Sequence, residues 1–387
     1  MIGVRRTLSG LAALIAATPA FAALDVARLD RRLERLVATR EDVIGLAVGV
    51  VDAGETVLIK GYGLTARAGE AVTEATVFRW ASVSKGAAAT LAVLIAEDGR
   101  LSLDAPVRDF MTTLRLPRAG ARVRDVLSHR LGIVNNAYDL RLEDGRAPAA
   151  IRRSLGTLEP ICAPGTCHGY QNVAFDAMAE ILSEAARAPY DAVLRTRLFE
   201  PLAMSSAGLG AAALSAAPSV ARPHHRPRGA EAYAEIPLAS VYDGLPAAAG
   251  LVSDITDFTA YLRAQMGLRP EVLSTQTLET LHTPVVSTTR EQLRLQRRYP
   301  RLERAEYALG WRVYAYAGRT LVGHRGGVDG YRALILFDPA LRSGVVALWN
   351  STSGRPMGLQ FEVMDAIYDL APIDHLQLDP EQADINP

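Results

Sequence analysis

Apolar and polar positions follow two different periods along this chain. Near the N-terminus, apolar residues recur at helical spacing, which predicts an amphipathic helix over residues 25–39. Two short β-branched runs follow, residues 45–52 and 55–61, and the Ala53-Gly54 pair between them is typical of a hairpin turn. In the C-terminal third, the two-residue period of strands returns. The elements expected there are strands over residues 311–317, 320–323, 331–337 and 344–349 and a helix over 359–370.

The middle of the chain has a different pattern from both ends. Strong helix formers fill residues 82–97, and residues 100–265 are mostly helical in pattern, with loops rich in proline and glycine. We therefore expect an α/β (α+β) fold, in which N- and C-terminal segments form one antiparallel sheet flanked by helices, with an all-α domain inserted between them. The arginine-rich residues 288–304 are interpreted as a solvated loop or flap. The expected division is a sheet subdomain (23–99 and 266–372), a helical subdomain (100–265) and a polar tail (373–387).

The N-terminus has the pattern of a removable export signal. Arg5 and Arg6 precede an apolar stretch over residues 8–21, which is too short to span a bilayer. The stretch ends in an Ala-Phe-Ala tripeptide, whose small residues suit signal peptidase. We expect a signal peptide over residues 1–22, a mature chain in the periplasm and no membrane span after cleavage. The sequence leaves open whether export uses the general or the twin-arginine route.

Charge and cysteine content exclude several classes of function. The 42 basic and 42 acidic residues balance, and the pI near 7.1 gives no electrostatic footprint for nucleic acid or an anionic membrane. Two cysteines, Cys162 and Cys167, are too few for a disulfide scaffold or a zinc site built from cysteines. Whether these two pair with each other in a single disulfide is left open by the sequence.

Ser82 and Lys85 form the first candidate catalytic pair. A serine followed three residues later by a lysine, at the start of a helix, places both side chains on one face. The hydroxyl is a weak nucleophile until a base accepts its proton, and a lysine serves as that base only when burial lowers its pKa. Only two of the 387 residues are lysines, Lys60 and Lys85. A lysine here therefore indicates a need for an amine that can lose its proton, which an arginine does not do.

Tyr170 and Asn172 form the second group of candidate residues. They follow a turn, and we expect a helix to begin near Asn172. A phenol beside a lysine can pass protons to and from it, and an amide can bind both the lysine and a substrate carbonyl. The pair therefore fits the proton transfer that Ser82 and Lys85 require.

His324, Gly326 and Gly327 form the third group, at the edge of an expected strand. Glycines at a strand edge let a substrate backbone approach closely. They also leave the Gly327 N–H free to point toward a substrate. Together with the Ser82 N–H, it would form an oxyanion hole with two donors.

These groups, in this order, resemble the S-x-x-K, Y-x-N and K/H-x-G motifs of the serine β-lactamase and penicillin-binding protein family. The resemblance is to the class C β-lactamase and D-Ala-D-Ala carboxypeptidase type, and it extends over almost the whole mature chain. It implies a β-lactamase/transpeptidase-like fold, with an active site between a sheet domain and an all-α domain. The motifs stand at residues 78–85, 170–172 and 324–326, and supporting stretches match at 123–132, 198–204, 249–253 and 309–311.

The resemblance also implies a role for each motif residue. Ser82 is the expected acylated nucleophile, and Lys85 and Tyr170 are the expected proton-transfer pair. The implied reaction forms an acyl-serine from an amide or ester, which water then hydrolyses, and it needs no metal or other cofactor. The residues expected to contact the substrate or its oxyanion are Asn172, His324, Gly326 and Gly327.

His324 departs from the class C pattern, in which a lysine usually stands at this position and helps to hold the substrate carboxylate. A histidine is mostly neutral at pH 7 unless a partner raises its pKa. In this family, a histidine is familiar from D-Ala-D-Ala carboxypeptidases, D-amino-acid peptidases and several esterases. Arg325 does not easily replace the lysine, because adjacent strand residues face opposite sides.

His129 is interpreted as a structural, hydrogen-bonding histidine.

We therefore expect an exported serine hydrolase, monomeric, that hydrolyses amide bonds of β-lactams or D-alanyl peptides. Its substrate would be a small molecule or a peptide derived from peptidoglycan, with no nucleic acid involved. Two alternatives stay open at this point. One is an esterase or D-stereospecific amidase of the same family, and the other is a penicillin-binding protein without turnover.

Overall fold

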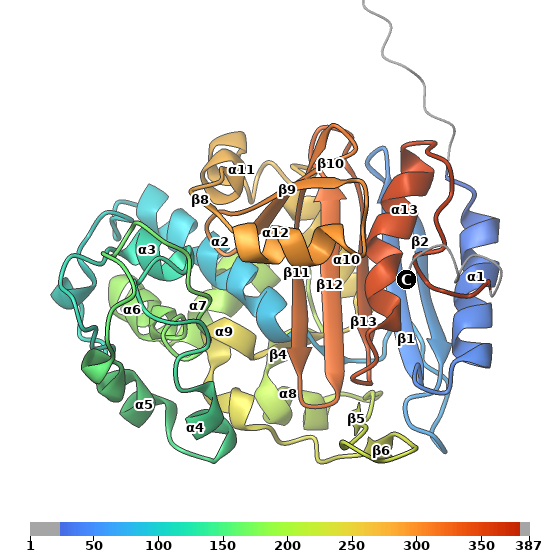
Figure 1. Cartoon of the computed structure of the whole chain (residues 1–387), viewed down its shortest axis with the longest axis horizontal. Helices are drawn as coiled ribbons and strands as arrows, with labels where there is room; N and C mark the ends of the chain where they lie inside the picture. Colours follow the sequence, from blue (N-terminus) through green and yellow to red (C-terminus); the bar gives the residue numbers. More distant parts are fainter. Residues whose placement is uncertain (1–23, 380–387) are drawn as a thin grey trace, which may run out of the picture.

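The computed structural model describes residues 24–379, which form a large antiparallel sheet with helices on both faces and a helical region at one end (Figure 1). Its first strand pairs with its last, with Leu46 opposite Trp349, so both ends of the chain meet in one sheet. The expected fold class is confirmed. In spatial order, the strands are β2 (Glu55–Gly63), β1 (Gly45–Asp52), β13 (Ser343–Trp349), β12 (Tyr331–Asp338), β11 (Arg319–Val328), β10 (Arg312–Tyr316), β9 (Leu302–Tyr307) and β8 (Val286–Ser287).

Two small sheets and the helices complete the fold. The small sheets contain β3 (Phe78–Arg79), β7 (Leu251–Ser253) and β4 (Gly208–Leu209), and β5 (His224–His225) with β6 (Ala234–Glu235). No helix within residues 24–379 combines the length and the apolar character that a membrane span requires. The α-helices are α1 (Val26–Thr39), α2 (Ser84–Glu97), α3 (Val123–Leu127), α4 (Asp139–Glu143), α5 (Pro148–Ser154), α6 (Ala177–Ala186), α7 (Tyr190–Leu194), α8 (Gly210–Ala216), α9 (Pro246–Ala249), α10 (Ile255–Gln265), α11 (Thr275–His282), α12 (Thr289–Gln296) and α13 (Leu359–Ile367).

Each face of the large sheet packs against its own apolar layer. Alternate residues of a strand point to opposite faces. Leu46 and Val48 of β1 therefore join the core beneath α1 and α13, whereas Ala47 joins the core on the side of α2 and α10. Leu295 of α12 belongs to the first of these cores, so α12 lies on the same face as α13 (Figure 1).

Helix α2 is buried on all sides. Every residue from Ser84 to Ile95 is buried, which is the pattern of a core helix rather than an amphipathic one. It packs against α6, α9 and α11 and so stands between the large sheet and the helical region. Since Lys85 belongs to its first turn, the start of α2 positions the expected catalytic pair at the junction of the two regions.

Two expectations about local structure are wrong. Residues 288–304 do not form a solvated loop: α12 and the start of β9 lie there, because Leu295, Tyr299 and Leu302 are buried in the core. The helix expected to begin near Asn172 begins only at Ala177, after a series of turns.

The expected subdomain division stays a prediction. Helix α10, at the end of the expected helical subdomain, packs against β1 and β13 of the large sheet. In the expected polar tail, Leu376 and Leu378 are buried beside α1 and α13. The expected signal peptide, residues 1–22, lies outside the described residues.

Candidate active site

Ser82 lies in a strained turn that leads into α2. The turn is a short 3-10 helix over Ala81–Val83. Ala81 has a φ of 49°, in the left-handed region that side-chain-bearing residues rarely adopt, and such strain persists only where neighbours maintain it. The Ser84 hydroxyl is one such neighbour: it donates to the Ala81 carbonyl (2.7 Å) and accepts from the Leu251 N–H (3.0 Å). The Ser82 side chain is left partly exposed, as a nucleophile must be.

The side-chain nitrogen of Lys85 is buried among neutral oxygen atoms. Its Nζ lies 3.4 Å from Ser82 Oγ, 2.8 Å from Asn172 Oδ1 and 2.9 Å from the Ala248 carbonyl of α9. It also lies 4.9 Å from the centre of the Tyr170 ring. The spacing of three residues thus brings amine and hydroxyl together as predicted. The contact with Ala248 has no sequence signal, because a backbone carbonyl leaves no mark in the sequence.

The turn that carries Tyr170 is held by its backbone. The Tyr170 N–H donates to Asn135 Oδ1 (2.7 Å), and the Tyr170 carbonyl accepts from the Asn136 N–H (2.7 Å). Just before this turn, Cys162 and Cys167 form a disulfide, which answers the question that the sequence left open. The disulfide closes a short loop ahead of Tyr170 and so limits the freedom of the segment that presents the phenol.

Asn172 uses both ends of its side-chain amide. Oδ1 accepts from Lys85, while Nδ2 donates to Asp139 Oδ2 (2.7 Å). Burial raises the pKa of Asp139, although the bond from Asn172 and the nearby Lys85 act in the opposite direction. The Asn172 amide therefore lies between Lys85 and Asp139 and bridges them by hydrogen bonds, one to each. Sequence analysis missed Asp139, which lies in α4 without any recognisable motif.

Strand β11 presents an open edge beside Ser82. β10 pairs with β11 only as far as Gly323, so residues 324–328 have no strand partner on that side within the described chain. A Cβ on Gly326 would lie 2.3 Å from the Trp80 carbonyl and 3.0 Å from the Ser82 nitrogen. Glycine is therefore required for this close approach. Gly327 follows directly, and the oxyanion role of its N–H stays a prediction.

His324 is buried, and both of its ring nitrogens have partners. Nδ1 lies 2.8 Å from the Arg325 carbonyl, and Nε2 lies 3.0 Å from the Tyr307 hydroxyl. Burial and the nearby Arg312 and Lys85 hold the pKa of His324 well below its usual value. The ring is therefore neutral at pH 7, and it does not supply the positive charge of the class C lysine.

Two arginines near this open edge share one carboxylate. Glu291 of α12 pairs with Arg312 of β10 and accepts from Arg325 Nη2 (2.9 Å). Because α12 covers the face of α1 and α13, this bond places Arg325 on the side away from His324, as expected. The Arg312 guanidinium lies 5.5 Å from the centre of the Tyr170 ring. Arg312, Arg325 and Glu291 together carry one net positive charge. Sequence analysis did not identify Arg312, the member of this group that lies beside Tyr170.

The structure thus brings the sequence-predicted residues into one place. Ser82 and Lys85 come from the start of α2, Tyr170 and Asn172 from the turn before α6, and His324 from β11 together with its two following glycines. The residues that sequence analysis missed are Asp139, Ala248, Tyr307 and Arg312, which surround these groups.

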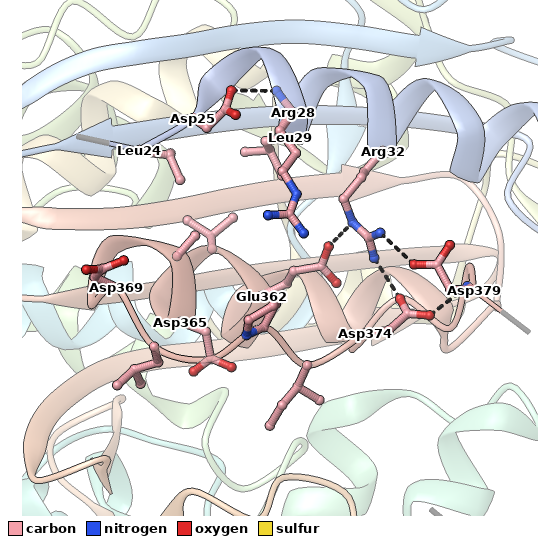
Figure 2. Close-up of a pocket in the computed structure, with 15 residues that line it drawn as sticks. Leu24, Asp25, Arg28, Leu29, Arg32, Glu362, Asp365, Asp369, Asp374 and Asp379 are labelled. Atoms are coloured by element: carbon pink, nitrogen blue, oxygen red, sulfur yellow. Dashed lines mark hydrogen bonds and ion pairs between the residues drawn. The ribbon is translucent and has the colours of Figure 1, made fainter. Parts of the chain in front are cut away.

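A cavity of about 370 Å³ lies away from Ser82, between α1, α13 and the C-terminal segment (Figure 2). Arg32 spans it by pairing with Glu362, with Asp374 at 2.7 Å and with Asp379 at 3.2 Å. The cavity is lined by charged side chains, these pairs among them, and by apolar ones, and its lining includes no serine or cysteine nucleophile. It therefore does not compete with Ser82 as a site for acyl transfer.

Comparisons with known proteins identify the family of the chain. The model of the family described as Beta-lactamase matches residues 29–367. An unguisins hydrolase of Aspergillus campestris is 26% identical over 86% of this chain, although the chain spans only 64% of that protein's length. Penicillin-binding protein 4 of Amycolatopsis lactamdurans is 27% identical over 85% of this chain and 86% of its own.

A solved structure shares the fold. The octameric penicillin-binding protein homologue from Pyrococcus abyssi superposes with a TM-score of 0.81 at 23% identity, over 91% of this chain and 79% of its own. Since the family model covers most of the chain and the fold agrees, the resemblance seen in the sequence motifs is confirmed. The chain belongs to the family described as Beta-lactamase.

Proposed function

We propose that this protein is an exported hydrolase that forms an acyl-enzyme on Ser82 and cleaves amide bonds of D-alanyl peptides or β-lactams. The Lys85 nitrogen accepts the Ser82 proton while Oγ attacks the substrate carbonyl. The N–H groups of Ser82 and Gly327 stabilise the oxyanion that forms. Lys85 then passes the Ser82 proton by way of the Tyr170 hydroxyl to the leaving amine. Water hydrolyses the acyl-serine: the water proton moves by way of Tyr170 to Lys85, which returns it to Ser82 Oγ as the acyl bond breaks.

The observation that carries this proposal is the surroundings of Lys85. Its buried nitrogen lies 3.4 Å from a partly exposed serine hydroxyl. Its other polar contacts are the oxygen atoms of Asn172 and Ala248, which carry no charge. Within residues 24–379, no carboxylate forms an ion pair with this nitrogen, and its position suits exchange of a proton with Ser82.

A second candidate function is an esterase or D-stereospecific amidase. It is favoured by His324, because both of its nitrogens are bonded inside the protein and its ring is neutral. A substrate that relies on a cation at this position to hold its carboxylate would lose that contact. Esters and D-amino acid amides without a carboxylate at this place lose nothing.

Location and assembly are part of the same proposal. The pattern of residues 1–22 supports cleavage of a signal peptide and a mature enzyme in the periplasm. We also propose that the mature enzyme acts as a monomer on a small molecule or on a peptide derived from peptidoglycan. N-terminal sequencing of the exported chain and its size in solution test these two points.

One panel of substrates tests the reaction. Purified protein is incubated with a fluorescent penicillin, a chromogenic cephalosporin, a nitrophenyl ester and a D-alanyl-D-alanine peptide, beside Ser82→Ala and the exposed control Ser205→Ala. We expect turnover that falls by roughly 10³-fold or more in Ser82→Ala and stays unchanged in Ser205→Ala. Cleavage of the ester alone would select the second candidate. A persistent penicillin label would indicate a binding protein, and equal activity of Ser82→Ala would refute the nucleophile.

A further inference from the structure

A chain of hydrogen bonds joins the two halves of the site without including Ser82. It begins at the Gln171 N–H, which lies 3.2 Å from His129 Nδ1, and continues from His129 Nε2 to the Tyr307 hydroxyl at 3.1 Å. From Tyr307 it reaches His324 Nε2 at 3.0 Å and ends at the Arg325 carbonyl, 2.8 Å from His324 Nδ1. Gln171, His129, Tyr307 and His324 are all buried.

The two ends of this chain determine the direction of every bond within it. The Gln171 N–H can only donate, so His129 Nδ1 carries the lone pair and its neutral ring has the proton on Nε2. That proton is donated to Tyr307, whose hydroxyl is then free to donate to His324 Nε2. The His324 proton therefore lies on Nδ1 and is donated to the Arg325 carbonyl, which can only accept.

Burial and, after it, the surrounding charges keep the hydrogen-bonded side chains neutral. Burial comes first in lowering the pKa of both His129 and His324, and the nearby cations act in the same direction. Burial likewise raises the pKa of Tyr307 well above its usual value. A proton added to either ring would have to remain in an apolar interior that already contains cations. The titratable and charged groups near the two rings are Lys85, His168, Tyr170, Tyr307, Arg312 and, on the other face of β11, Arg325.

Backbone geometry shows that His129 is held in place. Its φ of 58° lies in the left-handed region, which residues other than glycine adopt uncommonly. Its ring also packs 4.3 Å from the Tyr170 ring, centre to centre. The contacts of His129 with Gln171, Tyr307 and Tyr170 thus offset a local strain in the wall of the site.

Both ends of the chain of hydrogen bonds are adjacent in sequence to candidate site residues. Gln171 stands between Tyr170 and Asn172, and Arg325 stands between His324 and Gly326. We propose that His129 and Tyr307 are positioning residues that hold His324 in its neutral Nδ1–H form and keep the Tyr170 turn in register with the open edge of β11. The need for this register rests on the proposed function, whereas the bonded chain itself does not depend on it.

The tautomers provide a test that does not depend on activity. In full-length protein with ¹⁵N-labelled histidine, NMR distinguishes protonated from unprotonated ring nitrogens. We expect His324 as the Nδ1–H form and His129 as the Nε2–H form, both unchanged from pH 5 to 8. An imidazolium signal or the opposite tautomer at either residue would overturn the proposal, even if Ser82 is the nucleophile.

A matched pair of variants tests the positioning role. Tyr307→Phe keeps the ring and removes the hydroxyl that links the two histidines. Tyr316→Phe also removes one buried tyrosine hydroxyl, which donates to Asp365 of α13 and lies in the other core. We expect Tyr307→Phe to lower kcat of ester or amide hydrolysis by about 10- to 100-fold, with KM within about twofold, and to release the His324 tautomer. We expect Tyr316→Phe to change neither readout.

Two outcomes would contradict the positioning role. One is a Tyr307→Phe protein with unchanged kcat and an unchanged His324 tautomer. The other is an equal loss of kcat in Tyr307→Phe and Tyr316→Phe, which would indicate a general loss of stability. If Tyr307→Phe does not fold, the tautomers of the wild-type protein still decide the proposal. If no substrate is turned over at all, the proposed function fails, and the tautomers decide the bonded chain separately.

Discussion

The two lysines of this chain lie in opposite surroundings. Lys60 of β2 is at the surface, with 39% of its side chain exposed, and its Nζ bonds to Asp30 at 2.8 Å and to Glu34 at 3.0 Å. The bonds to Asp30 and Glu34 raise the pKa of Lys60. Lys85 is buried, and the oxygen atoms next to its Nζ belong to a hydroxyl, an amide and a backbone carbonyl.

This difference separates two uses of one side chain. Carboxylates around Lys60 hold it as a fixed positive charge, a task that an arginine can also perform. Neutral acceptors around Lys85, with a hydroxyl within reach, suit a group that exchanges a proton. All other basic residues of the chain are arginines. The surroundings of the two lysines indicate that Lys85, not Lys60, occupies the position that needs an amine.

The largest expected effect comes from replacing each lysine by arginine. Lys85→Arg should lower kcat/KM for the ester or amide substrate by roughly 10³-fold or more, because a guanidinium does not accept the Ser82 proton. Lys60→Arg should keep the wild-type value, because its carboxylate partners accept either cation. Steady-state kinetics of the two variants check this. If Lys85→Arg keeps activity within about tenfold, Lys85 is not the base.

A carboxylate placed beside Lys85 would make its surroundings resemble those of Lys60. Asn172→Asp should lower kcat/KM by about 10- to 100-fold and shift the rise of activity to higher pH, because a neighbouring negative charge favours the charged amine. Asn172→Ala should lower activity without that shift, since it removes the contact but adds no charge. The pH profiles of both variants check this, and identical profiles would show that charge at this position is irrelevant.

As the pH falls, protonation of the buried histidines should lower the free energy of unfolding before the Lys60 ion pair is affected. Burial lowers the pKa of His168 to about 4 and of His282 to about 3, and it lowers the pKa of His129 and His324 as well. The unfolded chain therefore binds protons first as pH falls below about 6.5, and the free energy of unfolding decreases by a few kcal/mol toward those lower values.

The bond from Lys60 lowers the pKa of Asp30 below its usual value, so the contribution of this ion pair persists until the pH falls below about 4. Thermal unfolding between pH 7 and pH 4.5 should show the same decrease of Tm in the wild type and in Lys60→Met. A Tm that stays constant across this range would contradict the neutral, buried state of the histidines.

The smallest expected effect is that of Lys60→Met itself. Exposed ion pairs contribute little, so this variant should lose about 1 kcal/mol or less of unfolding free energy at pH 7. The loss should shrink between about 0.1 M and about 1 M salt, since salt screens exposed charges. Urea unfolding at both salt concentrations checks this. A loss that salt does not reduce would mean that Lys60 stabilises the fold by packing rather than by charge.

Local patterns predicted α1, α2, α13 and six strands of the large sheet. The helix α1 and the hairpin of β1 and β2 follow from periodicity, which depends only on neighbouring residues. The prediction failed at residues 288–304, because the arginines of α12 face outward while Leu295 reaches a core formed by distant strands. It also failed before α6, where Asn172 lies in a turn and bonds to Asp139 of α4 and to Lys85.

The sequence by itself determined the family and the candidate residues Ser82, Lys85 and Tyr170, because short motifs specify residue types at fixed spacing. Only the tertiary structure decided the state of His324. The protonation state of His324 depends on its bond with Tyr307 and on burial by groups from several elements. No pattern within the His324 motif predicts the contact with Tyr307. Protonation responds to every charge and dipole within a few ångströms, and these come together only when the chain has folded.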